Sequence, residues 1–440
     1  DPFERNLETF RTQPNEGELF YGLIQRGNDL WNATFFCGSS AVIRRSALME
    51  VGGIAVETVT EDAHTALRMQ RLGYHTAYID VPQIGGLATE SLSAPVGQRQ
   101  RWARGMAQIF RIDNPLLGRG LSIGQRLCYA AAMLHFFHAL PRLVFLLAPL
   151  SYLFFGAQIL RGSPALVLAY ALPHLLHSTL TNSRTQGRFR YSFWSEVYET
   201  SLAPFIALPT TLALIAPKLG SFNVTAKGGQ VAQSYFDRRI AWPHIAIAAL
   251  NLAGLAVGLT RLYVGAPNAD VALLNAGWCV YNLLLLGAAL AVARESRQRR
   301  AVPRLDARLP AALLLPNGHT RSAETRDLSM TGARLRVASL PPQTPGSLVT
   351  LCWVNADRLA IPAVVVRHSG QDLQLRFDAL SIDARAALVE CMFSRADTWS
   401  SWHQGRKPDR PWLEVVRIVL HGVRGLGEAC VAPFRSKVRP

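Results

Sequence analysis

The sequence has few acidic residues and lacks the cysteine patterns of metal centres and disulfide-rich domains. It contains 30 Asp and Glu residues against 46 Lys and Arg residues, which gives a formal net charge of +16 at pH 7. Its six cysteines lie far apart, with no Cys-x-x-Cys and no Cys/His cluster, so we expect neither a zinc site nor a disulfide framework and favour a reducing compartment. The basic excess indicates an anionic partner: a nucleic acid, a phosphorylated ligand or an anionic membrane surface.

An initiator methionine and a signal peptide are also missing, since the chain begins at Asp1 without a leader. Its 440 residues are enough for two or three domains. The first residues resemble the middle of a domain rather than its beginning. We therefore interpret the chain as a piece of something longer.

Charged residues are absent from four long stretches in the middle of the chain. A helix needs about 20 apolar residues to cross a bilayer, so the sequence predicts about four transmembrane helices, over 132–160, 162–183, 240–260 and 271–293. The second is the weakest, because Pro173, His174 and His177 lower its apolarity. A large soluble helical core is the alternative.

The same region, 121–298, also holds an expected interfacial helix, 191–217, and a polar loop, 221–230.

The basic residues of this region are concentrated in two segments, 181–239 and 294–304. Loops rich in Lys and Arg tend to remain in the cytoplasm. This tendency places both flanking parts of the chain, 1–120 and 299–440, on the cytoplasmic side.

Residues 31–80 alternate helix-like and strand-like pieces, which is typical of an α/β domain. A helix is expected from near Thr60 to a stop at Gly73, followed by a strand in HTAYID. Glu61 and Asp62 therefore lie at a helix N-terminus, where capping and the helix dipole alone would explain two acids.

A second motif, GQRQRWARG, follows about 40 residues later. On a helix, Gln98, Arg101, Trp102 and Gly105 share one face. An amide, a guanidinium and an aromatic plane suit an anionic leaving group and a stacked sugar ring. A basic amphipathic helix on a membrane surface, with Arg99 projecting elsewhere, is the alternative, and both can hold.

Together these motifs resemble the TED and QxxRW signatures of processive family-2 glycosyltransferases, which build cellulose, chitin or hyaluronan from UDP-sugars. FFCGS, Phe35 to Ser39, is similar to the acceptor-side motif of the bacterial cellulose synthase family. FNVTAKGG, Phe222 to Gly229, is similar to its FxVTxK gating loop. The resemblance implies that 1–120 is the C-terminal part of a GT-A α/β glycosyltransferase domain in a multi-domain integral membrane protein.

The resemblance also implies roles for individual residues. Asp62 would be the catalytic base that takes the proton of the acceptor hydroxyl, with Thr60 and Glu61 shaping the site. The residues that would bind the acceptor and the diphosphate are Gln98, Arg101, Trp102, Phe36, Cys37 and Gly38. For Cys37, an equal alternative is that it is a small, buried apolar residue that contacts no ligand. Phe222, Val224, Thr225 and Lys227 would belong to the gating loop that contacts UDP.

The family carries further aspartates, in DDG and DxD motifs, for the uracil and the metal. Neither motif occurs in this sequence. We expect Mg²⁺ to be bound by residues of a missing N-terminal part, predict no metal ligand within this chain, and expect the fragment alone to be inactive.

After the last apolar stretch, short alternating strands predict a small β-barrel over 299–396. Arg300-x-x-x-Arg304 and Asp327-x-Ser329-x-x-Gly332 are similar to the PilZ signature, which implies cyclic di-GMP binding. Arginine forks suit phosphates and guanine bases, and a carboxylate suits the guanine edge. A juxtamembrane basic cluster is the alternative explanation for the arginines. The tail, 397–440, is basic and amphipathic, and its pattern does not decide between the cytoplasmic domains and the membrane.

The expected function is polymerisation of β-1,4-glucan from UDP-glucose by an inverting, processive enzyme of the bacterial inner membrane, coupled to export and activated by cyclic di-GMP. The expected partners are UDP-glucose, the growing glucan, cyclic di-GMP, a periplasmic synthase subunit and membrane lipid, with no nucleic acid polymer. Two alternatives remain: a chitin-like or hyaluronan-like product, or a non-catalytic cyclic di-GMP receptor and membrane anchor.

Overall fold

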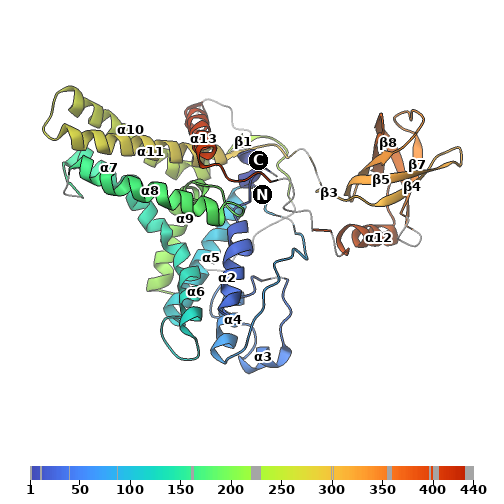
Figure 1. Ribbon diagram of the computed structural model, residues 1–440, viewed down its shortest axis with the longest axis horizontal. Helices are drawn as coiled ribbons and strands as arrows, with labels where there is room; N and C mark the ends of the chain where they lie inside the picture. The colour runs from blue at the N-terminus through green and yellow to red at the C-terminus, as the bar shows by residue number, and fades with distance from the viewer. Residues whose placement is uncertain are drawn as a thin grey trace. The chain divides into compact units, whose positions relative to one another are not determined.

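The computed structural model divides the chain into two compact units, which we call the helical unit (1–80, 87–297 and 405–440) and the barrel unit (81–86 and 298–404). Figure 1 shows the elements of both. The structure describes residues 2–9, 12–38, 40–86, 88–159, 163–219, 229–298, 300, 302–353, 359–395, 398–399 and 406–431.

The helical unit begins with short helices and ends its first part on a long one. These are α1 (Pro2–Asn6), the π-helix η1 (Leu19–Ile24), α2 (Gln25–Leu30), α3 (Arg45–Glu50), α4 (Glu61–Arg71) and α5 (Ser93–Ile112). The helix expected between Thr60 and Gly73 is confirmed as α4. It ends where Gly73 adopts a φ of +87°, a conformation that suits glycine.

The prediction of a strand in HTAYID is wrong, because residues 74–80 form no β-strand pairing with another segment. Side chains bind the backbone N–H groups that a neighbouring strand would bind. Thr76 N donates to Asn32 Oδ1 at 2.9 Å, and Tyr78 N donates to Asp29 Oδ1 at 2.7 Å. Within the described part of the helical unit, the only paired strands are β1 (Tyr235–Phe236) and β2 (Arg294–Glu295).

Three helical segments of the described residues are long and apolar enough to cross a membrane: Ile123–Phe155, Arg238–Tyr263 and Ala269–Val292. The first combines α6 (Ile123–Leu134), the 3₁₀ turn η2 (His135–His138) and α7 (Ala139–Phe155), and the other two are α10 and α11. They correspond to three of the four predicted spans.

The fourth predicted span, 162–183, is helical but is not among these three candidates. It lies in α8 (Pro164–Gln186), none of whose residues is buried. Pro173 interrupts its interior, and its last two turns, from Thr181 on, are polar. These residues lower its apolarity below that of the other three.

The candidate spans are joined by a small polar cluster. The amides of Asn251 in α10 and Asn282 in α11 both donate to the carbonyl of Leu146 in α7, at 3.1 and 3.0 Å, and Asn282 also donates to Asn251 Oδ1 at 3.0 Å. Both asparagines are fully buried. Hydrogen bonds of this kind fix helix register where most contacts are apolar.

The interfacial helix expected over 191–217 forms as α9 (Trp194–Ile215), which packs against other helices, and its place at a membrane interface stays a prediction. It contacts α5, α7 and α11, and residues such as Trp194, Val197 and Ile206 are almost completely buried. Its two acids, Glu196 and Glu199, bind Arg142 of α7 at 2.5 and 2.6 Å. Pairing explains why charges are tolerated on a helix with so little exposure.

The tail of the chain forms α13 (Pro411–Val431), which packs against α11. Gly422 and Gly425 lie so close to Gly287 that a Cβ on Gly287 would come within 2.1 Å of the Gly422 carbonyl oxygen. Glu414, 1% exposed, accepts hydrogen bonds from Gln13, Trp194 and, within α13, Arg417. The helix of the tail is thus docked on the rest of the helical unit.

The barrel unit is a closed antiparallel sheet, as expected for this part of the chain. Its strands are β3 (Leu305–Asp306), β4 (Pro310–Leu314), β5 (Thr320–Ser329), β6 (Gly332–Val337), β7 (Leu348–Trp353), β8 (Ala360–Ser369) and β9 (Asp372–Phe377). They run in the order β3-β5-β4-β7-β8-β9-β6, and pairing of β6 with β5 closes the barrel. Alternate residues of each strand point inward, and Leu388 and Met392 of α12 (Ile382–Phe393) join the same core.

Candidate active site and regulatory site

The Thr60-Glu61-Asp62 turn is held directly against helix α5. A Cβ on Gly105 would lie 2.4 Å from Thr60 Oγ1 and 2.8 Å from Thr60 N, so only glycine allows this approach. Thr60 occupies the N-cap of α4, but its side chain makes no capping hydrogen bond. Side-chain capping by Thr60 therefore does not explain the motif.

Asp62 lies in a half-buried position beside the FFCGS segment. Gly38, with a φ of +77°, approaches so closely that a Cβ there would contact Asp62 Oδ2 at 3.4 Å. Burial raises the pKa of the Asp62 carboxyl, and the charge of Glu61 adds to the rise. The N–H of Ala63, which donates to Asp62 Oδ1 at 2.8 Å, and the charge of Arg101 oppose it. A carboxylate with a raised pKa is a better proton acceptor near neutral pH.

The Cys37 thiol lies near enough to the Asp62 carboxyl group to feel its charge. Burial, with the nearby charge of Asp62, raises the pKa of the Cys37 thiol to about 12, so it remains protonated. Gln25 holds the segment by donating to the Phe35 carbonyl at 2.8 Å. The structure thus brings Cys37 and Gly38 to Asp62, whereas Phe36 packs against the apolar cluster beneath them. A neutral thiol can contact a ligand but is no nucleophile.

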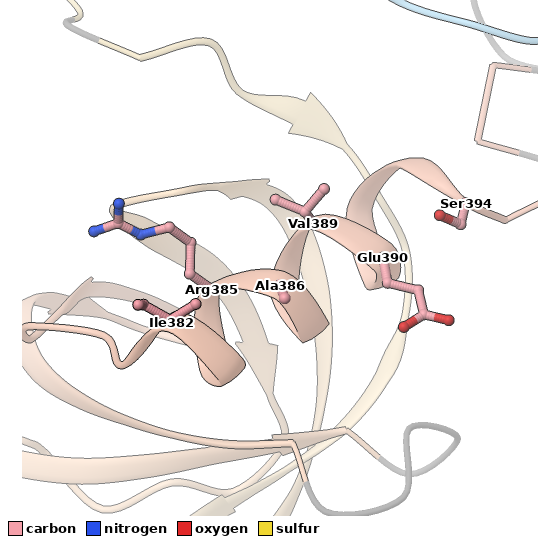
Figure 2. A pocket seen from close by; sticks show the side chains of 6 residues that line it. All are labelled: Ile382, Arg385, Ala386, Val389, Glu390 and Ser394. Carbon is pink, nitrogen blue, oxygen red and sulfur yellow. The ribbon is translucent and has the colours of Figure 1, made fainter.

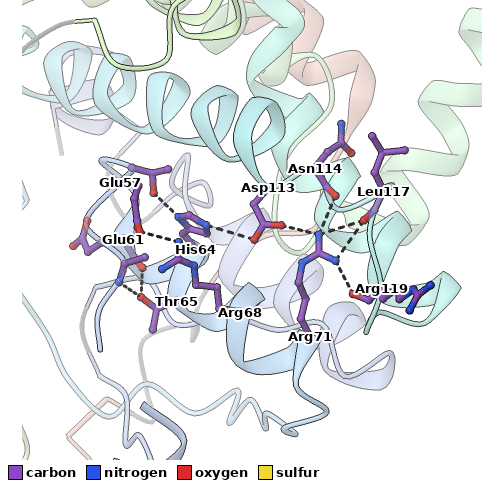
Figure 3. A network of polar contacts seen from close by, with 12 residues as sticks. Glu57, Glu61, His64, Thr65, Arg68, Arg71, Asp113, Asn114, Leu117 and Arg119 are labelled. Atoms are coloured by element: carbon purple, nitrogen blue, oxygen red, sulfur yellow. Dashed lines mark hydrogen bonds and ion pairs between the residues drawn. The ribbon is translucent and has the colours of Figure 1, made fainter. Parts of the chain in front are cut away.

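A polar network fixes α4 to the end of α5 (Figure 3). Asp113 binds Arg71 at 2.8 Å and lies 3.5 Å from His64 Nε2, while His64 Nδ1 lies 3.2 Å from Thr58 Oγ1. Burial alone would raise the pKa of Asp113, but His64 and Arg71 outweigh it and lower the pKa. Sequence reasoning missed these residues, although His64 and Arg71 share a helix face at i and i+7.

The predicted face of α5 is helical, but its aromatic ring is partly covered. The guanidinium carbon of Arg99 lies 4.2 Å from the centroid of the Trp102 ring, and Arg99 is ion-paired with Glu16. The expectation that Arg99 projects elsewhere is wrong, because residues three apart on a helix are neighbours. One face of the ring is therefore taken by a cation.

Arg304 and Asp327, from the two halves of the arginine-aspartate signature, lie together in the barrel unit. Arg304 Nη1 binds Asp327 Oδ1 at 2.9 Å, while Arg300 is exposed. Ser329 and Gly332 shape the turn between β5 and β6. Ser329 Oγ donates to the Gly332 carbonyl at 3.0 Å, and a Cβ on Gly332 would come within 2.3 Å of the Leu375 carbonyl oxygen.

Comparison with family models matches residues 5–213 to "Glycosyl transferase family group 2" and residues 298–394 to "PilZ domain". The chain is 54% identical to "Cellulose synthase catalytic subunit (UDP-forming)" of Pseudomonas fluorescens strain SBW25, over 99% of this chain and 60% of that protein. It is 52% identical to the protein of the same name from Xanthomonas axonopodis pv. citri, over 97% of this chain and 59% of that protein. "Cellulose synthase 2" of Novacetimonas hansenii is 47% identical, over 97% of this chain and 27% of that protein.

The chain is thus similar, over nearly its whole length, to catalytic subunits of bacterial cellulose synthase. It spans about 60% of the length of the two catalytic-subunit relatives. The glycosyltransferase match contains the Asp62 site and helix α5, and the PilZ match contains Arg304 and Asp327.

Four residues expected in the gating loop, Phe222, Val224, Thr225 and Lys227, lie outside the described residues. The backbone that follows them is described. Strand β1 pairs with β2, and Arg297 N donates to Ser234 Oγ at 2.9 Å. This pairing joins the chain after the expected loop to the segment that leads to the PilZ barrel.

A metal site and a surface hollow are two further candidates for a functional site. Among the described residues, no three His, Cys, Asp or Glu side chains are grouped so as to hold a metal ion. Figure 2 shows a shallow hollow on the outward side of α12, lined by Ile382, Arg385, Ala386, Val389, Glu390 and Ser394. All six residues come from this helix or its C-cap, so no second element encloses a ligand there.

Proposed function

We propose that the full protein forms β-1,4-glucan from UDP-glucose, with Asp62 as the catalytic base. The observation that carries this proposal is the placement of Asp62: its carboxyl group is half-buried against Gly38 and Cys37, on a turn that α5 holds through Gly105. The names of the relatives, which specify cellulose and a UDP-forming reaction, supply the substrate and product.

In the proposed reaction, a hydroxyl oxygen of the acceptor glucan attacks the anomeric carbon of UDP-glucose. The proton of that hydroxyl passes to the Asp62 carboxylate, and the bond from the anomeric carbon to the diphosphate oxygen breaks, which releases UDP. A single displacement inverts the anomeric configuration. Burial favours the step, because it raises the proton affinity of Asp62.

The other motif residues would hold the reactants. We assign the face of the Trp102 ring opposite Arg99 to the acceptor sugar, and Gln98 and Arg101 to the acceptor and diphosphate. The described residues do not provide a metal site. We therefore assign no step to Mg²⁺, and propose that any Mg²⁺ ligands lie on residues outside this chain.

We further propose that cyclic di-GMP binds the PilZ barrel and activates synthesis. Arg304 and Asp327, already paired at 2.9 Å, would bind a ligand phosphate and a guanine edge, with Arg300 supplying a second guanidinium. Ser329 and Gly332 would contribute the turn that positions Asp327.

We propose a location in the bacterial inner membrane, with both flanking parts in the cytoplasm and export of the glucan to a periplasmic synthase subunit. The three candidate spans support the membrane location. Helix α13 would lie at the inner lipid interface. It packs on α11, while Trp412 (83% exposed), Val416, Leu420 and Val423 leave an apolar outer face.

The test uses the full-length protein in membranes with radiolabelled UDP-glucose and cyclic di-GMP. We expect an alkali-insoluble product that a β-1,4-glucanase degrades, and no product from Asp62→Asn. UDP binding by this variant should be largely unchanged, because a base acts in the transition state and not on the donor. A product formed only from UDP-N-acetylglucosamine would indicate a chitin-like polymer. Cyclic di-GMP binding without any product would indicate a receptor.

A further inference from the structure

Gln108 connects two backbone segments that the known motifs do not include. Its side chain is 3% exposed and extends from α5. Oε1 accepts a hydrogen bond from Val59 N at 3.1 Å, and Nε2 donates to the carbonyl of Pro217 at 2.5 Å. Val59 immediately precedes Thr60-Glu61-Asp62, and Pro217 lies two residues beyond the end of α9.

The orientation of this amide follows from its partners. A backbone N–H can only donate and a proline carbonyl can only accept, so the oxygen must face Val59 and the nitrogen must face Pro217. Both bonds satisfy backbone groups that would otherwise lose a partner in a buried place.

The Val59 bond belongs to a set of contacts by which α5 holds the start of α4. Gly105, one turn before Gln108, abuts Thr60, and Asp113, at the end of the helix, binds Arg71 beside His64. The same helix carries Gln98, Arg101 and Trp102 in its first half. Gln108 is therefore part of the connection between the two motifs.

The Pro217 bond belongs to a second set, in which α5 satisfies carbonyls of α9. Pro209 has no N–H for the carbonyl of Phe205, four residues earlier, and Gln100 Nε2 donates to that carbonyl at 3.1 Å. Arg111 Nε donates to Leu214 O, in the last turn of α9, at 3.2 Å. Of these three side chains, Gln108 also accepts a hydrogen bond from the backbone of Val59, at the entry to the Asp62 turn.

We infer that Gln108 is a positioning residue for glycosyl transfer: its amide ties the backbone entering the Asp62 turn to the end of α9, and so keeps the Asp62 carboxylate in register with the acceptor-binding face of α5. This inference rests on the proposed function. Gln108 does not touch the reactants and acts through Val59.

The substitutions Gln108→Met, Gln108→Glu and Gln100→Met separate the bonds. Methionine has nearly the same shape but removes both hydrogen bonds of Gln108. Glutamate retains an oxygen that accepts from Val59 N–H, whether or not it is ionised. Gln100→Met removes the bond to Phe205 on the same pair of helices and leaves Val59 untouched.

In the full-length protein, we expect Gln108→Met to lower kcat about tenfold or more, with the KM for UDP-glucose within about threefold of wild type, because misplacement of a catalytic group affects the transition state more than donor binding. Gln108→Glu should stay within about threefold of wild-type kcat, and Gln100→Met within about twofold. The melting temperature should fall for Gln108→Met and Gln100→Met, since each loses a hydrogen bond to α9 or to the residues just after it, and for Gln108→Glu when its carboxyl is ionised and cannot donate to Pro217.

The activity of Gln108→Glu decides between positioning and general support of the fold. Equal kcat losses in Gln108→Glu and Gln108→Met, or in Gln100→Met and Gln108→Met, would overturn the inference, as would a rise in KM alone. Should Gln108→Met not fold, Gln108→Glu is compared with Gln100→Glu, and a lower kcat for Gln108→Glu would refute the role of Val59. An inactive wild-type protein would instead contradict the proposed function.

Discussion

Replacing Gly105 by alanine should displace the Thr60-Glu61-Asp62 turn by a distance that the structure defines. The new Cβ would lie 2.8 Å from the backbone nitrogen of Thr60, and ordinary contacts of a Cβ begin at 3.4 Å. The Thr60 side chain can rotate away, but its backbone cannot, so α5 and the turn must separate by about 0.6 Å, the difference between these two distances. Overpacking of this kind costs about 1–3 kcal/mol, which exceeds the gain of about 1 kcal/mol or less from alanine's helix propensity.

The effect on activity should be larger than the effect on stability. A shift approaching 1 Å at a catalytic group can lower the rate about 10- to 100-fold. Gly97→Ala is the matched control, because it lies in the same helix and its Cβ would meet nothing within 4 Å. We expect Gly97→Ala to raise the melting temperature slightly and keep glucan synthesis near wild type. Gly105→Ala with wild-type kcat would refute the view that α5 sets the position of Asp62.

Three further results are expected. The kcat/KM of the full-length protein should fall with decreasing pH at a higher pH than an ordinary aspartate would give, because the pKa of Asp62 is raised in the free protein. The same rise means that the folded state binds the extra proton, so stability falls as pH rises from 3.8 through the folded pKa. Asp62→Asn should therefore have a higher melting temperature than wild type at pH 7. A pH profile and thermal scans check both. Trp102→Ala should shorten the glucan and lower the rate about tenfold while Trp102→Phe retains activity, measured by product length, and equal losses in both would contradict stacking. Arg304→Ala should abolish binding of radiolabelled cyclic di-GMP, whereas Arg334→Ala, which breaks a different ion pair of the barrel, should not; equal binding by the two variants would exclude Arg304 as a ligand contact.

Local patterns in the sequence were sufficient for several elements. Helix α4 follows from its start near Thr60 and the Gly73 stop, and α10 and α11 follow from long charge-free stretches. The barrel strands follow from alternation and turn residues. In each case the signal lies within one element, because helix and strand periodicities depend on neighbouring residues.

Features that depend on partners far away in the sequence were decided only by the tertiary structure. Residues 74–80 lack a strand because Asn32 and Asp29 bind their N–H groups, and α9 is buried because α5, α7 and α11 surround it. The docking of α13 through Gly422 and Glu414 also needed partners from other parts of the chain.

In the candidate site, too, some features could be predicted from the sequence and others depended on the tertiary structure. Its motifs, around Asp62 and Trp102, could be recognised from residue types and spacing. Their relative placement could not, because it depends on one close approach at Gly105, a buried amide at Gln108 and the Asp113 ion pair. None of these has a periodic signal, since a hydrogen bond across 49 residues is set by how two helices pack and not by the sequence around either end.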